Sequence, residues 1–375
     1  MLRTSVIVLS ATVLAAFTAA AFAADAQGDI WILSGQSNAC GRAEGAGLPP
    51  EERVQTYDMA SHRWVKAQEP LPMMGGSPGT LGPWHAAGLE VAKPGPTIRL
   101  MGYASGGMPI SHWDDGQGGW TTLGANIKRC GEGARVFLWY QGESDAKDGM
   151  DAKTYQAKLA ALVAKIRAAG KNPAMLAVIV QLGGWKNNSG DFMPVREAER
   201  QFVIADGNAV LVPALGRKMQ DYVHLDRDGY LELGKEIGRA ILRVYYKRKE
   251  VDWPGPVMDA AVAAADGKTV LAHFAEVKKL AGFEAADFGA TDAKGAVKCV
   301  KIQAENTRLA LTFERALTPP AKLIYGFGQA PAATLVDEAG NRAPAVQLDL
   351  TAGVVPPDKE TSAPNGAGAP AQVKK

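Results

Sequence analysis

The stretch DIWILSGQSN, residues 29–38, joins a short apolar run to a turn that contains Gly35. The apolar part, Asp29 to Ser34, is typical of a buried strand. Four more runs of this kind predict strands, at 97–104, 134–140, 174–182 and 209–212. Apolar residues at helical spacing predict helices over 152–169, 195–204 and 230–246. Strands that alternate with helices favour an α/β fold with a mainly parallel sheet, covered by helices on both faces.

Three of the predicted strands end in loops in which glycine stands beside serine or glutamine. These loops are Gly35-Gln36-Ser37-Asn38, Ser105-Gly106-Gly107 and Gln141-Gly142-Glu143. Open parallel sheets bind their ligands beyond the carboxyl ends of the strands. We therefore expect the functional site at this edge of the sheet.

The chain changes character after Lys249. Residues 252–256, Asp-Trp-Pro-Gly-Pro, are typical of a linker, and short alternating runs follow, separated by turn residues. This pattern predicts a small C-terminal β-sandwich domain over 256–350, after a first domain over 24–250. Residues 356–375 are rich in Pro, Gly, Ala and polar residues, which predicts a disordered tail.

The N-terminus has the features of an export signal. Arg3 precedes an apolar run from Val6 to Ala20, and Ala21-Phe22-Ala23 suits a signal peptidase. We expect residues 1–23 to be a cleaved signal peptide, so that the mature protein is secreted or periplasmic. A membrane anchor is the alternative, but the run is short and rich in alanine, so we expect no stable membrane association. An oxidising compartment permits one disulfide among Cys40, Cys130 and Cys299 and leaves one thiol over.

Charge and spacing exclude several functions. The 375 residues contain 41 Lys and Arg against 39 Asp and Glu, without the basic excess expected of a nucleic-acid binder. The three cysteines lack zinc-ligand spacing. A calcium loop starting at His224 fails, because its twelfth position is Lys235 instead of Glu. We therefore expect neither metal nor other cofactor.

Ser37 is the candidate nucleophile, because it follows a predicted strand in a sharp turn. Taken alone, such a serine is more often a helix N-cap. A nucleophilic serine needs a base, and His224 is the one histidine of five with a carboxylate three residues before it, Asp221. At this spacing Asp221 can accept from Nδ1 and leave Nε2 to face the serine. A solvated loop pair is the alternative reading of Asp221 and His224.

Two segments offer donors for an oxyanion. A backbone N–H of Gly106 or Gly107 could face it, although paired glycines more often form ordinary turns. The side chain of Gln141 offers another N–H. Glu143 is either a second acid or part of a buried structural pair, and we favour the structural role because a Ser-His-Asp system needs no second carboxylate.

Three ordered segments resemble the signature blocks of the SGNH-type carbohydrate acetylesterases, which include sialate O-acetylesterases and the acetylxylan esterases of carbohydrate esterase family six. These segments are Gly35–Asn38, Trp139–Ser144 and Asp221–His224. Residues 104–113 are similar to the Gly-Gly block of this group with its tryptophan, Trp113. The resemblance spans about residues 29–245 and departs at Ala39-Cys40, where methionine is more usual.

The resemblance implies a three-layer α/β/α, flavodoxin-like fold and deacetylation without a metal. It assigns Ser37 as nucleophile, His224 as base and Asp221 as its partner. The oxyanion hole would comprise the Ser37 N–H, a Gly106 or Gly107 N–H and the Gln141 side chain. Asn38, Glu143 and Trp113 would bind substrate or serve the structure.

The expected function is an exported serine esterase that removes O-acetyl groups from carbohydrate through an acetyl-enzyme. We expect the activity to resemble that of a sialate O-acetylesterase. Two alternatives stay open: a non-catalytic carbohydrate-binding protein on the same fold, and a lipase or thioesterase of the wider SGNH group.

Overall fold

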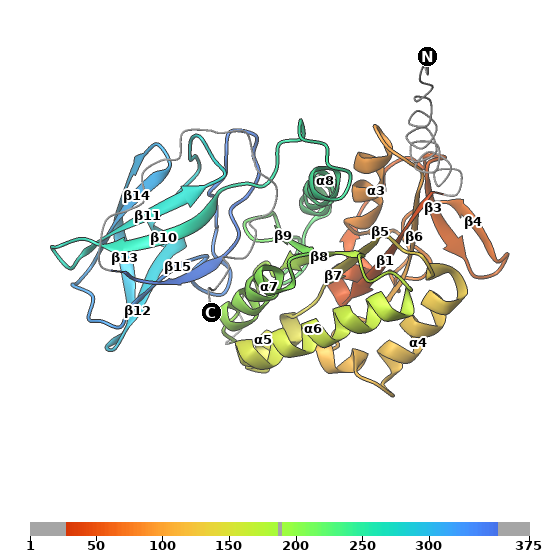
Figure 1. The fold of residues 1–375 in the computed structure, drawn as a ribbon, viewed down its shortest axis with the longest axis horizontal. Coiled ribbons are helices and arrows are strands. Elements are labelled where there is room, and N and C mark those ends of the chain that lie inside the picture. The colour runs from red at the N-terminus through yellow and green to blue at the C-terminus, as the bar shows by residue number, and fades with distance from the viewer. Residues whose placement is uncertain (1–27, 187–189, 352–375) are drawn as a thin grey trace, which may run out of the picture.

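The computed structural model describes residues 28–186 and 190–351, and it has a mixed α/β fold with two sheets (Figure 1). The first sheet has seven strands in the order β4-β3-β6-β1-β7-β8-β9. Neighbouring strands run parallel except β3 and β4, which are antiparallel. The strands are β1 (Asp29–Gly35), β3 (Val54–Asp58), β4 (Arg63–Lys66), β6 (Ile98–Ala104), β7 (Val136–Tyr140), β8 (Leu176–Gln181) and β9 (Ala209–Pro213).

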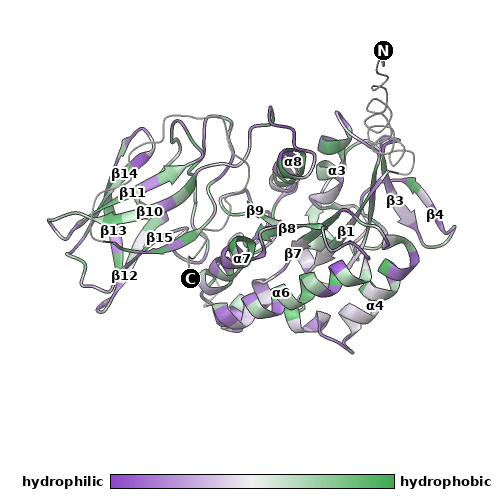
Figure 2. Ribbon diagram, in the orientation of Figure 1, coloured by the Kyte–Doolittle hydropathy of each residue, from purple (hydrophilic) through white to green (hydrophobic). Residues whose placement is uncertain are grey.

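The central strands lie in the core because their sequences are apolar throughout. Every residue of β7 and of β8 is buried, as expected for strands covered on both faces. In Figure 2 β8 is hydrophobic, whereas α6 carries hydrophobic and hydrophilic residues together. The five predicted strands are confirmed as β1, β6, β7, β8 and β9. We did not predict β3 and β4, which extend the sheet beyond β6 at one edge.

Helices lie on both sides of this sheet in Figure 1, with α3 and α8 on one side and α4, α6 and α7 on the other. Their bounds are α3 (Trp84–Ala92), α4 (Gly118–Asn126), α6 (Ala152–Ala169), α7 (Met193–Asp206) and α8 (Arg227–Val244). The three predicted helices are confirmed as α6, α7 and α8. Glycine lets α8 approach α3 closely, because a β-carbon on Gly234 would lie 2.3 Å from the Pro83 carbonyl oxygen.

Short elements complete the first domain around the site. They are α2 (Ser37–Cys40), β2 (Ala43–Glu44), β5 (Thr80–Leu81), η2 (Ile110–Trp113), η3 (Ile127–Gly131) and α5 (Glu143–Lys147). The helix α8 begins at Arg227, three residues earlier than predicted, because the Asp226 side chain accepts from the Gly229 N–H at 2.8 Å. Asp226 is therefore the N-cap, and Asp228 lies in the first turn.

The second sheet is antiparallel, with the order β10-β11-β14-β13-β12-β15-β16. Its elements are β10 (Val257–Ala263), β11 (Thr269–Ala275), η4 (Ala285–Asp287), β12 (Phe288–Asp292), β13 (Gly295–Glu305), β14 (Arg308–Phe313), β15 (Lys322–Tyr325) and β16 (Val346–Asp349). The long strand β13 pairs with β12 over residues 295–298 and with β14 over residues 299–305, and its register with β14 shifts between Cys299 and Lys301.

This second sheet curls until its edges meet. The Thr351 N–H donates to Ala261 O at 3.0 Å, and the Ala263 N–H donates to Thr351 O at 3.1 Å. The result is one continuous sheet close to a barrel, and the prediction of a sandwich of two sheets is corrected accordingly. Alternating patterns identify the strands but do not show how the edge strands meet.

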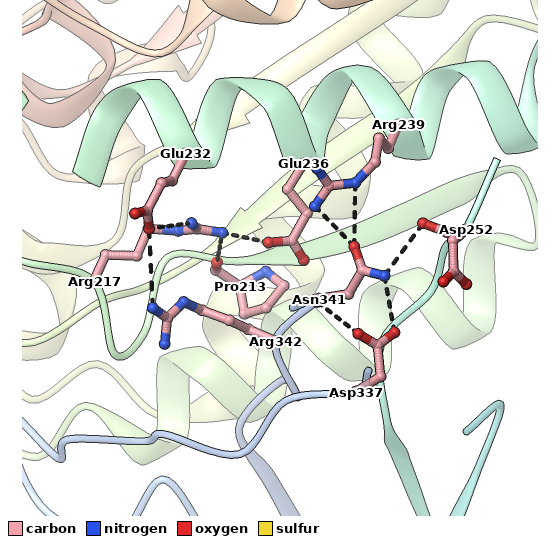
Figure 3. Close-up of polar contacts among 9 residues, drawn as sticks. All are labelled: Pro213, Arg217, Glu232, Glu236, Arg239, Asp252, Asp337, Asn341 and Arg342. Atoms are coloured by element: carbon pink, nitrogen blue, oxygen red, sulfur yellow. Dashed lines mark hydrogen bonds and ion pairs between the residues drawn. The ribbon is translucent and has the colours of Figure 1, made fainter. Parts of the chain in front are cut away.

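Buried polar contacts join the two domains (Figure 3). Within the first domain, Arg217 pairs with Glu236 of α8, and both side chains are 2% exposed. Arg239 of α8 donates to the side-chain oxygen of Asn341 in the second domain at 2.8 Å. Asn341 in turn donates to Asp337 at 2.8 Å. Arg239, Asn341 and Asp337 thus form a connected chain of hydrogen bonds across the domain boundary, which favours one arrangement of the two domains.

The predicted signal peptide, residues 1–23, and the predicted tail, residues 356–375, lie outside the described residues. Within the described part, no helix is both long and apolar enough to cross a membrane. Cys40, Cys130 and Cys299 are all free thiols, so the disulfide that an oxidising compartment permits is not formed. Cys40 is buried in the first domain and Cys299 in a strand of the second, and burial raises the pKa of Cys40 to about 11.

Candidate active site

Gly35 turns the chain from β1 into α2 and so presents Ser37. Its φ is +141°, and a β-carbon there would lie 2.0 Å from the Tyr140 carbonyl oxygen, so only glycine fits. Ser37 is half-buried and is the first residue of α2. The N-cap position is occupied by Gln36, without a side-chain cap bond, so Ser37 is not the capping residue.

The structure brings Ser37, His224 and Asp221 together. His224 Nε2 lies 2.9 Å from Ser37 Oγ, and His224 Nδ1 lies 2.7 Å from Asp221 Oδ2. The side chains of His224 and Asp221 are 16% and 35% exposed, so this is a partly buried contact and not a solvated loop pair. The three side chains form one line from carboxylate to imidazole to hydroxyl, which is the order that activates a serine.

Asp221 is held by its own loop. Its Oδ1 accepts from the backbone N–H groups of Val223 and His224, at 2.8 and 2.7 Å. Burial acts to raise the pKa of Asp221, but these two N–H groups and the His224 ring outweigh it, so the pKa is lowered. Asp221 is therefore ionised at neutral pH and can hold the Nδ1 hydrogen of His224.

The loop that carries His224 has an internal hydrogen bond, and two further hydrogen bonds join it to the loop after α2. The Gln220 N–H donates to His224 O at 3.1 Å. The Gln220 side chain donates to Arg42 O at 2.7 Å and accepts from the Glu44 N–H at 3.1 Å. These bonds connect the histidine loop to the segment that follows Ser37.

Asn38 connects three loops beneath the site. Its side-chain N–H group donates to Glu143 Oε1 at 2.6 Å and to Val223 O at 3.2 Å, and its oxygen accepts from the Tyr230 hydroxyl at 2.6 Å. Asn38 is 1% exposed and Glu143 is 2% exposed. Both therefore occupy structural positions behind the serine, which is the role favoured for Glu143. Burial raises the pKa of Glu143 to about 7.

Sequence reasoning missed Tyr230 as part of this cluster. In the sequence, Tyr230 has the pattern of an apolar helix position. In the structure it is fully buried in α8. One signal was available, because a buried tyrosine hydroxyl usually finds a hydrogen-bond partner. The sequence offered no way to choose Asn38 as that partner.

The two glycines of the Ser105-Gly106-Gly107 loop differ in their distance from the serine. A β-carbon on Gly106 would lie 3.6 Å from Ser37 Cβ, whereas one on Gly107 would meet nothing within 4 Å. Within residues 28–186 and 190–351, the N–H groups of Ser37 and Gly106 donate to no acceptor. Gly107 instead adopts a φ of +72°, which allows the loop to turn.

Gln141 lies beneath this loop and is fully buried. Its side-chain nitrogen has three acceptors: Asp145 Oδ2 at 2.5 Å, Gln36 Oε1 at 3.1 Å and Met108 O at 3.1 Å. The amide has only two hydrogens, so donation to an oxyanion would compete with these contacts. Asp145, which sequence reasoning did not select, also accepts from the Ile110 N–H at 2.9 Å.

Trp113 belongs to the hydrophobic core. It is 1% exposed and meets Trp139 edge to face with 5.0 Å between ring centroids. Of its two predicted roles, the structural one fits this position. In the described part of the chain, no three His, Cys, Asp or Glu side chains lie where they could hold a metal ion together.

A serine, a histidine and an aspartate joined in this order, at the carboxyl edge of a parallel sheet, have the geometry of a serine hydrolase. Comparison with known proteins narrows this class. Residues 27–243 match the family described as "Carbohydrate esterase, sialic acid-specific acetylesterase". Because this match covers more than half of the chain, the protein belongs to that family and is a carboxylic ester hydrolase, a carbohydrate acetylesterase.

Individual proteins agree with the family. A probable carbohydrate esterase of Arabidopsis thaliana is 29% identical over 239 residues, covering 57% of this chain and 90% of the relative. A carbohydrate acetylesterase from Xanthomonas citri, XAC1771, has a similar structure, with a TM-score of 0.65 and 18% identity. That similarity covers 86% of this chain and 80% of the other, so it includes much of the second domain and supports the fold.

Proposed function

We propose that this protein is an exported serine esterase that removes O-acetyl groups from carbohydrate through an acetyl-enzyme. Membership of the acetylesterase family supports an acetyl ester as the bond that is hydrolysed and a carbohydrate as the substrate. The observation that carries the mechanism is the distance of 2.9 Å between His224 Nε2 and Ser37 Oγ, with Asp221 behind the imidazole.

In the first half of the reaction, Ser37 Oγ attacks the acetyl carbonyl carbon while His224 Nε2 takes the hydroxyl proton. The tetrahedral intermediate collapses, the bond from the acetyl carbon to the sugar oxygen breaks, and His224 gives its proton to that oxygen. In the second half, His224 takes a proton from water, and the water oxygen attacks the acetyl carbon. Acetate leaves, and the proton returns to Ser37.

The negative charge on the intermediate needs donors that are ready before the reaction. The Ser37 N–H and the Gly106 N–H suit this role, since the two residues are adjacent and neither N–H is otherwise engaged. Gln141 is the third proposed donor, and it would have to exchange one of its present acceptors for the oxyanion.

We further propose a sialate O-acetylesterase-like substrate, a three-layer SGNH arrangement of the first domain, and export to the periplasm or beyond. The family description supports the first of these proposals. The sequence of residues 1–23 supports the last. Mass spectrometry of the protein recovered from its native compartment should find a mature N-terminus at Ala24, whereas retention of residues 1–23 would contradict export with cleavage.

An acetate-release assay tests the function. We expect the wild-type protein to release acetate from acetylated sialic acids, and acetylated xylans serve as the comparison substrates. Ser37→Ala should abolish release, while Ser61→Ala, in the exposed turn between β3 and β4, should keep it. Turnover by Ser37→Ala, or lack of reaction of Ser37 with a serine-directed organophosphonate, would show that the nucleophile is wrong.

A further inference from the structure

An exposed aromatic side chain lies beside the site. Six large apolar side chains are exposed in the described part of the chain: Met59, Val65, Met108, Ile204, Tyr222 and Val300. Tyr222, 51% exposed, is the only aromatic among them, and it stands between Asp221 and His224 in sequence. Exposed apolar groups on ordered loops around a site are typical of ligand contacts.

Trp185 extends this surface away from the histidine. It follows β8, so it lies at the same carboxyl edge of the sheet as Ser37. Its ring centroid is 5.6 Å from that of Tyr222, with 35° between the planes, and the Tyr222 centroid is 6.5 Å from that of His224. Phe192, fully buried, meets Trp185 at 6.1 Å. A row of aromatic rings thus runs from the core to the catalytic imidazole.

The backbone around these two rings is fixed on both sides. The Lys186 N–H donates to Tyr222 O at 2.7 Å, and the Trp185 N–H donates to Gln329 O of the second domain at 3.1 Å. The carbonyl of Gln329 also accepts from the buried guanidinium of Arg196, at 3.2 Å. A surface held in this way loses little freedom when a ligand binds.

The direction of the reaction places the sugar here. The sugar oxygen leaves the acetyl carbon with a proton from His224 Nε2, so the sugar must lie on the His224 side of Ser37. Tyr222 is the exposed ring on that side. A sugar ring presents apolar C–H groups on its faces, and an aromatic ring is the side chain that covers such a face best.

We propose that Trp185 and Tyr222 form an aromatic platform on which the sugar ring of the substrate stacks while its acetyl group lies at Ser37. This inference rests on the proposed function and adds the residues that bind the sugar. Lys147 Nζ, 5.9 Å from the Trp185 ring centroid, lies at the rim of the platform within reach of sugar hydroxyls.

A comparison of an acetyl ester that has no ring with acetyl esters of sugars tests the platform. Vinyl acetate carries the acetyl ester without a ring, and methyl tri-O-acetyl-β-xyloside or 9-O-acetyl-N-acetylneuraminic acid carries it on a sugar. For Trp185→Ala and Tyr222→Ala, we expect the ratio of kcat/KM on the sugar ester to kcat/KM on vinyl acetate to fall about tenfold, as for the loss of one stacked ring. The change should lie mainly in KM, and Trp185→Phe and Tyr222→Phe should keep most of the ratio.

Trp64 provides the matched control, because it is also half-buried but lies on β4 at the opposite edge of the sheet. Trp64→Ala should leave the ratio unchanged. Equal losses on both esters for Trp185→Ala, or no loss on either, would overturn the platform.

Binding to an inactive background separates this proposal from the proposed function. Calorimetric titration of the two sugar esters into Ser37→Ala should give a Kd that rises about tenfold when Trp185→Ala is added. If the wild-type protein hydrolyses neither sugar ester but the Kd still rises when Trp185→Ala is added, the proposed function is wrong and the platform is supported. If Ser37→Ala binds neither sugar ester, or binds equally well with Trp185→Ala, the platform is wrong.

Discussion

The hydroxyl of Tyr230 donates to the side-chain oxygen of Asn38 at 2.6 Å, and this bond joins the first turn of α8 to the residue beside Ser37. Tyr230 is fully buried, so the phenol fixes the asparagine without contact with solvent. Asn38 then holds Val223 O, one residue before His224. One buried tyrosine therefore helps to set the distance between the proposed nucleophile and its base.

Tyr230→Phe tests this relationship. The change leaves Asn38 Oδ1 buried without a donor, which should destabilise the protein by about 1–3 kcal/mol. We also expect kcat on p-nitrophenyl acetate to fall, because Asn38 can then shift. Thermal unfolding and steady-state kinetics give the two readings. Tyr57→Phe, on β3 and also largely buried, serves as the control, and equal behaviour of the two variants would contradict the role of Tyr230.

Asp221→Asn should preserve the fold and remove most activity. The amide cannot hold the Nδ1 hydrogen of His224 as a carboxylate does, so the wrong tautomer faces Ser37. By analogy with the serine proteases, kcat should fall by about 10³–10⁴. Asp228→Asn, in the first turn of α8, is the control. A loss below tenfold for Asp221→Asn would remove Asp221 from the proposed triad.

The two loop glycines should respond differently to alanine. A β-carbon on Gly106 would lie 3.0 Å from an Arg42 guanidinium nitrogen, which can move, and close to Ser37. We expect Gly106→Ala to lower kcat with little change in Tm. Gly107→Ala should lower the free energy of unfolding by about 1–2 kcal/mol, because its φ is +72°. Loss of kcat only in Gly107→Ala would assign the oxyanion N–H to Gly107 instead.

Glu143 should make stability depend on pH. Burial raises its pKa to about 7, against 4.5 for the free side chain, so the folded state binds more protons than the unfolded state between these values. The contribution of Glu143 to stability is therefore largest below pH 4.5, falls as pH rises to about 7, and is then constant.

Replacing Glu143 by Gln should remove this contribution. Urea unfolding at pH 5 and pH 7.5 should show a smaller loss of stability in Glu143→Gln than in the wild-type protein, by at most about 3 kcal/mol. Glu132→Gln, on the exposed turn after η3, is the control. If Glu143→Gln and the wild-type protein lose the same stability between pH 5 and pH 7.5, the Glu143 carboxylate is already ionised at pH 5.

Arg196 should be the most sensitive arginine at the domain interface. It is fully buried and donates to backbone carbonyls of both domains: Leu182, Gly183, Gly326, Gly328 and Gln329. Arg196→Met leaves these oxygens unsatisfied and should destabilise the protein by about 3–5 kcal/mol. Arg53 donates to two carbonyls at the surface, so Arg53→Met should change stability by less than about 1 kcal/mol. Similar losses in both variants would contradict the interface role.

Most of the first sheet could be predicted because buried parallel strands are continuous apolar runs. β3 and β4 were not predicted because β3 reads Val-Gln-Thr-Tyr-Asp and β4 is mostly exposed, so neither stands out by hydropathy. Ser37, His224 and Asp221 could be selected because Asp221 and His224 are three residues apart and Ser37 closely follows a strand. The Tyr230–Asn38 bond joins residues 192 positions apart, and no local pattern contains it.

The carbonyls that surround Arg196 also determine whether the first domain can be separated from the second without loss of contacts. The linker at 252–256 marks a boundary along the chain, yet Gly326, Gly328 and Gln329 lie beyond it and solvate a guanidinium that belongs to the first domain. A chain ending at Lys249 would lose three of the five residues whose carbonyls accept from this guanidinium, and also the hydrogen bond from the Trp185 N–H to Gln329 O.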